Sequence, residues 1–152
     1  MHTVKIGNFE VGAGNPLVLL AGPCVLESYE RSLYIGKTIK EITSRLGIPY
    51  VFKASFDKAN RSSYNGYRGP GLEKGLKWLQ SIKDELNVSV VTDIHNETQV
   101  EPVSKVVDVL QIPAFLSRQT DLLYTAAGIR MMVVSGLLLV NTTPSAGAAD
   151  RV

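Results

Sequence analysis

The sequence predicts an α/β fold of the (β/α)8-barrel type, with about the first four to five β/α units present. Strand-like apolar runs alternate with helix-like segments at short spacing, which is typical of βαβ units around a parallel sheet. Polar residues also follow the ends of four successive predicted strands. A barrel gathers functional groups at many strand ends, whereas a doubly wound sheet places ligands mainly at one switch point. The distribution over four strands therefore favours the barrel.

The first predicted elements are a hairpin, a strand and a long helix. The hairpin, over residues 3–11, turns at Gly7-Asn8, a typical two-residue turn signal. Residues 16–21 are continuously apolar, as expected of a strand that is buried on both faces. A helix is predicted over residues 30–46. Its apolar stripe consists of Leu33, Ile35, Ile39, Ile42 and Leu46.

The alternation continues after Gly47, which is the expected stop of this helix. Residues 50–54 form a second apolar strand, and residues 72–86 carry leucine and isoleucine at helical spacing. The later elements are a strand over residues 88–92, a short helix over 97–105, a strand over 106–110 and a helix that starts near 119–121. The end of the chain differs, because residues 131–140 are apolar without a helical stripe and residues 141–150 are small and polar like a tail.

Bulk composition excludes several classes of protein. With 45% hydrophobic and 20% charged residues, the chain is globular rather than disordered. Its formal net charge of +2 is too small to predict binding to nucleic acid. A single cysteine excludes an internal disulfide framework and fits a reducing compartment. Because the N-terminus lacks a signal-peptide core and the longest apolar run is too short to span a bilayer, we expect a soluble cytoplasmic protein without a membrane partner.

The richest segment for chemistry is residues 53–63, which supply three permanent cations, three hydroxyls and an amide directly after a buried-type strand. Lysine offers a compact point charge, and arginine a planar fork that matches phosphate oxygens. These residue types are rarely buried without a partner, so no packing role needs the combination. The segment predicts an anion-binding loop, with a solvated basic loop as the alternative. Its polar side chains are Lys53, Ser55, Lys58, Asn60, Arg61, Ser62 and Ser63.

Cys24 and the Asp93-Ile94-His95 segment follow two other predicted strands. A lone cysteine is usually a small buried hydrophobe, but this position would also suit a metal ligand or a nucleophile. No CxxC or HxxxH partner accompanies it, so the residues alone give no complete metal site. Asp93 and His95 share one face of a strand end, where aspartate could accept a sugar hydroxyl or orient a lysine. His95 is either a general acid or base or a structural histidine.

Two arginines have open interpretations. Arg118 lies beside a predicted helix start for which Thr120 is the expected cap, so it is either a phosphate ligand or an exposed charge. Arg68 follows the anion loop on a Gly/Pro turn and is either a further anion ligand or a brace at the entry of the next helix. Gln111 adds an amide after the fourth predicted strand of the alternating series.

Five motifs share one register along the chain. They are AGPCVLES at 21–28, VFKASFDKANRSS at 51–63, YRGPGLE at 67–73, TDIH at 92–95 and QIPAFLSRQTD at 111–121. Together they closely resemble 3-deoxy-D-manno-octulosonate 8-phosphate synthase from about residue 4 to residue 123. The resemblance implies a (β/α)8 barrel, usually a homotetramer. It also implies an aldol-type condensation of phosphoenolpyruvate with D-arabinose 5-phosphate for lipopolysaccharide (KDO) biosynthesis.

The resemblance also implies roles for single residues. Lys53 and Lys58 would face phosphoenolpyruvate and the reacting centre, and Asp93 the pentose. Arg118 would bind phosphate, serving a neighbouring subunit. Cys24 resembles the ligand of the metal-dependent branch of the family, which implies a divalent metal ion. The implied substrate-binding set is Ser55, Asn60, Arg61, Ser62, Gln111, Ala114 and Arg118, and the catalytic set is Lys53, Lys58 and Asp93.

The resemblance is expected to end after Leu123, so residues 1–123 would form the N-terminal half of the barrel and residues 124–152 a divergent end. Further lysine, arginine and metal-ligand positions of the family cannot be placed, a pattern that a frameshift or an early stop would produce. We therefore expect the isolated chain to be severely impaired. One alternative is a sister enzyme using erythrose 4-phosphate, against which residues 60–63 argue. The other is a non-catalytic fragment that binds sugar phosphate.

Overall fold

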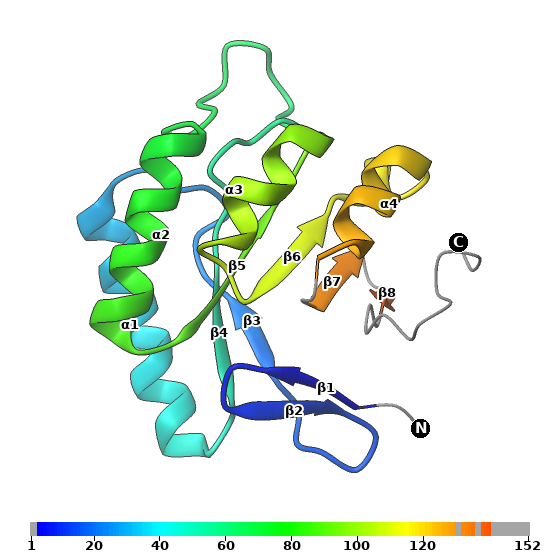
Figure 1. The fold of residues 1–152 in the computed structure, drawn as a ribbon. Helices are drawn as coiled ribbons and strands as arrows, with labels where there is room; N and C mark the ends of the chain where they lie inside the picture. The colour runs from blue at the N-terminus through cyan, green and yellow to red at the C-terminus, as the bar shows by residue number, and fades with distance from the viewer. Residues whose placement is uncertain (1–2, 130–131, 136–137, 141–152) are drawn as a thin grey trace.

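The computed structural model describes residues 3–129, 132–135 and 138–140, which form a curled six-stranded sheet with helices along one face (Figure 1). The strands are β3 (Leu19–Ala21), β4 (Tyr50–Lys53), β5 (Ser89–Asp93), β6 (Val109–Ile112), β7 (Met132–Ser135) and β8 (Leu138–Val140). Strands β3 to β7 are parallel and lie in sequence order, and β8 pairs antiparallel with β7. The order never reverses, so the sheet has no switch point, and the prediction of an α/β half-barrel is confirmed.

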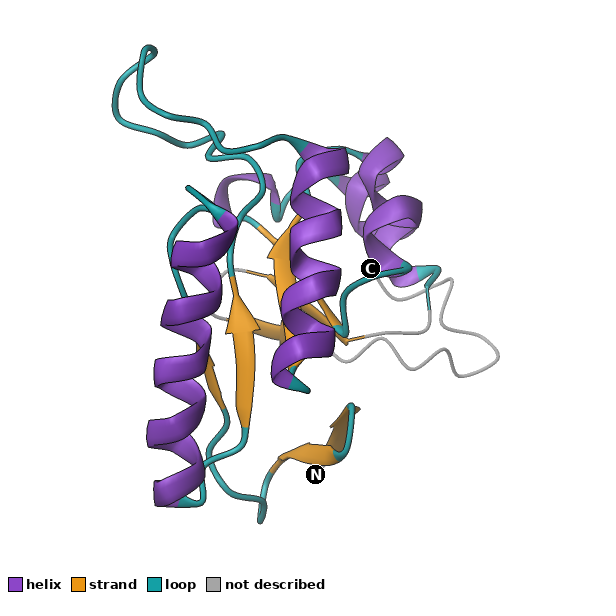
Figure 2. Ribbon diagram, turned by 90° about the vertical axis from the view of Figure 1, so that its left-hand side faces the viewer, coloured by secondary structure: helices purple, strands orange, loops and turns teal. Residues whose placement is uncertain are grey.

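Helices cover the outer face of this sheet (Figure 2). They are α1 (Tyr29–Leu46), α2 (Leu72–Leu86), α3 (Val100–Ser104) and α4 (Thr120–Ala127), with the short 3-10 turns η1 (Glu97–Gln99) and η2 (Ala114–Leu116). The ends of α1 agree with the sequence. Ser28 caps its start, where its hydroxyl accepts a hydrogen bond from the Arg31 amide, and Gly47 ends it in the left-handed conformation. No helix of the described residues is both long and apolar enough to cross a membrane.

Alternate residues of the central strands face two separate cores. Phe52, on β4, belongs to the larger core between the sheet and the helices, and Val51 to a smaller core on the inner face. The hairpin of β1 (Thr3–Ile6) and β2 (Phe9–Gly12) covers this inner face at the N-terminal ends of the strands, where Ile6 is fully buried. The opposite end of the inner face carries polar side chains. They lie on this face because residues two apart along a strand point to the same side.

The buried face of α1 differs from the predicted stripe. Ile42 and Leu46 are exposed, whereas Ser32, Gly36 and Thr43 are buried. A Cβ at Gly36 would lie 2.8 Å from Leu86 Cδ1 and 3.0 Å from a ring carbon of Phe52. The prediction for Ile42 and Leu46 was therefore wrong, because α1 approaches the sheet through small residues and leaves two of its large apolar side chains outside.

Two strand predictions also need correction. The run over residues 16–21 was expected to be buried on both faces, but Leu17 is 88% exposed and Leu19 is 39% exposed. β3 has a neighbour on one side only within the described sheet, which accounts for this exposure. The strand predicted over residues 106–110 begins three residues later, at Val109. Asp108 precedes it and binds Lys83 Nζ and the Val90 amide, which fixes the entry to β6.

Part of the expected divergent end is structured. β7 and β8 fall within residues 124–152, and β7 adds a fifth parallel strand to the sheet. The small, polar tail expected over residues 141–150 lies outside the described residues. The number of complete β/α units remains a prediction.

Candidate functional site

The inner face of the sheet ends in polar side chains at the C-terminal edge. Lys53 is the last residue of β4, and Asp93 the last of β5. Asp93 pairs in register with Gln111 of β6, so these two side chains lie beside each other on one face. Val51, Val91 and Val109 precede them by two residues and point into the inner core. The structure therefore brings Lys53, Asp93 and Gln111 to one edge, although Gln111 lies within its strand and not past its end as predicted.

Asp93 is held in a mostly buried network. Its Oδ2 accepts a hydrogen bond from His95 Nε2 at 3.1 Å, and the side chains of the pair are only 12% and 14% exposed. Burial alone would raise the pKa of Asp93, but hydrogen bonds from His95 and Ser55 outweigh it and lower the pKa below its usual value. Asp93 Oδ1 and His95 Nδ1 are buried with no hydrogen-bond partner in the described structure. The carboxylate therefore stays ionised at neutral pH.

Cys24 lies at the same edge, one strand away. Backbone hydrogen bonds from the Ser55 amide to the Cys24 carbonyl, and from the Leu26 amide to the Ser55 carbonyl, continue the pairing of β3 and β4 past their ends. Gly22 permits the approach, because a Cβ there would lie only 2.1 Å from the Lys53 carbonyl oxygen. The thiol is exposed, so the alternative of a buried apolar cysteine does not hold. Lys58 Nζ lies 2.7 Å from its sulfur.

A metal site cannot be completed from these residues. Among the described residues, no group of three or more histidine, cysteine, aspartate or glutamate side chains could hold a metal ion. Cys24 has an ammonium group as its neighbour where a second ligand would be needed. The described residues therefore do not fit a divalent metal by themselves, and no chemical step below depends on one.

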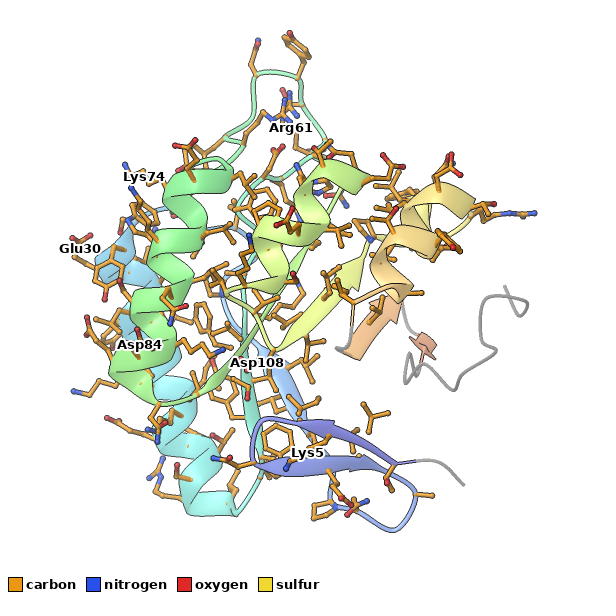
Figure 3. All side chains as sticks on the ribbon, in the orientation of Figure 1. Lys5, Glu30, Arg61, Lys74, Asp84 and Asp108 are labelled. Carbon is orange, nitrogen blue, oxygen red and sulfur yellow. The ribbon has the colours of Figure 1, made fainter. Side chains whose placement is uncertain are left out.

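The loop between β4 and α2 carries the other predicted ligands and extends away from the sheet, with Arg61 on it (Figure 3). Asn60 and Ser62 are exposed. Arg61 donates from Nε and Nη2 to the Tyr64 carbonyl at 3.0 and 2.8 Å, and its guanidinium lies 5.6 Å from the centre of the Tyr64 ring. In this structure Arg61 thus binds its own loop, and no contact among the described residues brings Asn60, Arg61 or Ser62 to the strand ends.

The segment after β6 places the last two predicted ligands at the surface. Ala114, in η2, and Arg118 are exposed, and Phe115 between them is 78% exposed. Thr120 is the first residue of α4 and not its cap; Gln119 holds the cap position without a side-chain hydrogen bond. The capping prediction for Thr120 was therefore wrong.

Comparison with known proteins gives the family of the chain. Residues 2–135 match the DAHP synthetase I family, which is most of the 152 residues. The chain belongs to the DAHP synthetase I family. The matched range extends past Leu123 and includes β7. A domain boundary at residue 123 stays a prediction.

Curated relatives within this family carry a more specific name. The chain is 60% identical over 125 residues to a 2-dehydro-3-deoxyphosphooctonate aldolase of Aliivibrio salmonicida, covering 82% of the chain and 44% of the relative. It is 58% identical over 150 residues to the protein of that name from Aliivibrio fischeri, covering 99% and 51%. A relative of the same name from Fusobacterium nucleatum is 58% identical over 127 residues, covering 84% and 46%. The chain thus spans about half the length of these relatives.

The candidate site lies along the C-terminal edge of the sheet. Two hollows of about 540 and 840 Å3 lie elsewhere, around the C-terminal ends of α1 and α2, and neither includes a predicted site residue. The larger hollow is lined by α1 and α2 alone, and the smaller also by the hairpin turn at Gly7 and Asn8. The candidate site is therefore defined by its charged groups, because anions are recognised by fixed charges and donors.

Sequence reasoning missed two contacts near the site. Arg68 forms a forked ion pair with Asp57, and Tyr64 holds Arg61. Asp57 and Arg68 are eleven residues apart in a loop. A loop has no periodicity from which their contact could be predicted. The tyrosine offered a weak signal, since an aromatic residue three positions after an arginine in a turn can receive its guanidinium.

Proposed function

We propose that this chain contributes to the synthesis of 3-deoxy-D-manno-octulosonate 8-phosphate from phosphoenolpyruvate and D-arabinose 5-phosphate. The shared name of the curated relatives supports this proposal. The observation that carries it is the convergence of Lys53, Ser55, Asp93 and Gln111 on one inner edge beside Lys58. This edge combines a cationic side for phosphate and carboxylate groups with an ionised carboxylate for a polyol.

The cations account for phosphoenolpyruvate, which carries a phosphate and a carboxylate. Lys53 is the half-buried last residue of β4 and shares the inner face of the strand with Val51. Lys58 lies in the following loop, on the side of Cys24. Two fixed ammonium groups at one edge can neutralise the charge of this substrate and orient its carbon–carbon double bond.

The carboxylate of Asp93 accounts for the second substrate. Its lowered pKa keeps it ionised, and its free Oδ1 can accept a hydrogen bond from a pentose hydroxyl. In the reaction, a carbon–carbon bond forms between phosphoenolpyruvate and the pentose aldehyde, water adds, and inorganic phosphate leaves. Asp93 then orients the sugar relative to the cations, while Asn60, Arg61 and Ser62 hold its phosphate end after Arg61 leaves the Tyr64 carbonyl.

The remaining parts of the proposal concern residues and partners at the margins of the site. Ala114 and Arg118 bind phosphate, with Arg118 directed to the site of a neighbouring subunit in a homotetramer, which its exposure permits. Cys24 contributes one ligand to a divalent metal whose other ligands are not among the described residues. The working compartment is the cytoplasm, consistent with a single free thiol.

Calorimetric titration and phosphate release test the proposal together. The chain should bind phosphoenolpyruvate, and it should bind arabinose 5-phosphate more tightly than erythrose 4-phosphate. Phosphate release is then measured with each sugar beside a full-length relative. Equal or better binding of erythrose 4-phosphate would point to the seven-carbon synthase. Binding without phosphate release would leave a sugar-phosphate-binding protein, and a folded chain that binds neither substrate would refute the proposal.

A further inference from the structure

The loop that carries Lys58 and Arg61 is closed at its base by a forked ion pair. Arg68 donates from Nε to Asp57 Oδ1 at 2.8 Å and from Nη2 to Asp57 Oδ2 at 2.5 Å. A guanidinium and a carboxylate that share two parallel hydrogen bonds fix both distance and orientation. Asp57 is the better covered partner, with 21% of its side chain exposed against 56% for Arg68.

Backbone hydrogen bonds also join the incoming and outgoing segments of the loop. The Lys58 amide donates to the Arg68 carbonyl at 2.5 Å, and the Gly71 amide donates to the Phe56 carbonyl at 3.1 Å. Gly69 lies between them with φ +115°, and a Cβ there would meet the Phe56 carbonyl oxygen at 2.3 Å. The incoming and outgoing segments therefore run against each other with no room for a side chain at Gly69.

This geometry decides between the two readings of Arg68. The fork occupies Nε and Nη2, the edge with which an arginine would grip a phosphate. The hydrogen bonds to Asp57, and then its charge, raise the pKa of Arg68 above its usual value. Arg61, seven residues earlier, lies away from the sheet on the projecting part of the loop (Figure 3).

We propose that Asp57 and Arg68 are positioning residues that clasp the base of the loop, and so hold Lys58 beside Cys24 and present Arg61 for an anion. Neither residue contacts the substrate. The part of this inference that concerns arabinose 5-phosphate rests on the proposed function. The closure of the loop itself rests only on the contacts above.

Amide hydrogen exchange, followed by NMR, tests the closure without any ligand. In Arg68→Gln and Asp57→Asn the Lys58 amide should exchange about tenfold faster, since charged hydrogen bonds that hold a segment add to its protection. Arg68→Lys, which keeps the charge but not the fork, should resemble Arg68→Gln. The double variant should exchange no faster than either single variant, because the two residues act as one unit. The Val90 amide, bonded to Asp108 in the core, is the internal reference for intact folding.

A matched control removes a different ion pair of similar chemistry. Glu101→Gln breaks the exposed pair between Glu101 on α3 and Lys105 just after it, and it should leave exchange at Lys58 unchanged. Unchanged exchange in Arg68→Gln and Asp57→Asn would overturn the clasp. So would full rescue by Arg68→Lys, because charge alone would then suffice.

Titration with arabinose 5-phosphate tests the positioning role. Each clasp variant should bind it about tenfold more weakly than the parent chain, and Glu101→Gln should bind it equally well. Faster exchange with unchanged affinity would overturn the positioning role. If the parent chain itself binds no arabinose 5-phosphate, the proposed function fails, and the exchange rates alone decide whether the clasp exists.

Discussion

Lys58 Nζ lies 2.7 Å from the sulfur of Cys24, and this contact joins the loop after β4 to the segment after β3. An ammonium group at this distance opposes a metal cation at the thiol. We expect Lys58→Met to strengthen Co2+ binding and Cys24→Ser to remove the cobalt–thiolate absorption band. The measurement is a spectroscopic titration with Co2+, with Lys74→Met as the control for a lost surface charge. Since Cys24 is the single cysteine of the chain, a parent chain that binds Co2+ without a thiolate band would exclude this cysteine as a ligand.

Replacing Lys53 should weaken binding of phosphoenolpyruvate. Lys53→Met keeps the stem that packs at the end of β4 but removes the charge, so we expect a loss of affinity of at least about tenfold. Calorimetry measures it. Lys74→Met is the matched control, since Lys74 lies on α2 with its ammonium 4.9 Å from the centre of the Trp78 ring, outside the site. Equal losses in both variants would mean that overall charge, and not position, governs binding.

The pH dependence of stability should report on Asp93. Its pKa in the folded chain is lower than the usual 3.8, so the folded state favours the ionised form. This contribution is present above the unfolded pKa and is lost as the pH falls from about that value through the folded pKa. Denaturant unfolding at a series of pH values should therefore show the parent chain losing stability relative to Asp93→Asn below pH 3.8. A constant difference over this range would contradict the lowered pKa.

Gly22 should tolerate no side chain. Its absent Cβ would lie 2.1 Å from a backbone oxygen, which cannot move as a flexible side chain does. We expect Gly22→Ala to cost about 1–3 kcal/mol in the free energy of unfolding, the usual range for overpacking. Gly128→Ala, whose Cβ would have its nearest neighbour at 3.4 Å, is the control. If chemical denaturation gives both variants the same stability, the segment before Cys24 is less tightly held than the structure indicates.

Local signals predicted most of the fold. The bounds of α2 agree with its apolar spacing, and Gly47 ends α1 as expected. The errors come from contacts that no local pattern contains. Val106 and Val107 are apolar and β-branched, yet β6 begins only after Asp108, whose side chain accepts hydrogen bonds from Lys83 and from the Val90 amide. The buried face of α1 was predicted wrongly for a similar reason. Gly36 is buried because the helix packs closely against Leu86 and Phe52.

For the candidate site, the sequence predicted where residues lie in the sheet better than which side chains they contact. Lys53 and Asp93 do end neighbouring strands, so their position at one edge of the sheet follows from parallel pairing. The bond between Asp93 and His95 also follows from a spacing of two. The partners of Arg61 and Arg68 could not be predicted, because loop conformation sets them, and both arginines bind residues of their own loop.

The alternation along β4 has a consequence for changes in chain length. Val51 and Lys53 face inward, while Phe52 between them fills the helix side. Inserting or deleting one residue in this strand would exchange the two faces, sending the lysine among the helices and the phenylalanine into the open edge. Loss of the Lys53 ammonium from the edge and loss of the core packing of Phe52 would then be a single event. We therefore expect every length change within β4 to prevent folding, and none to give a protein that folds but lacks activity.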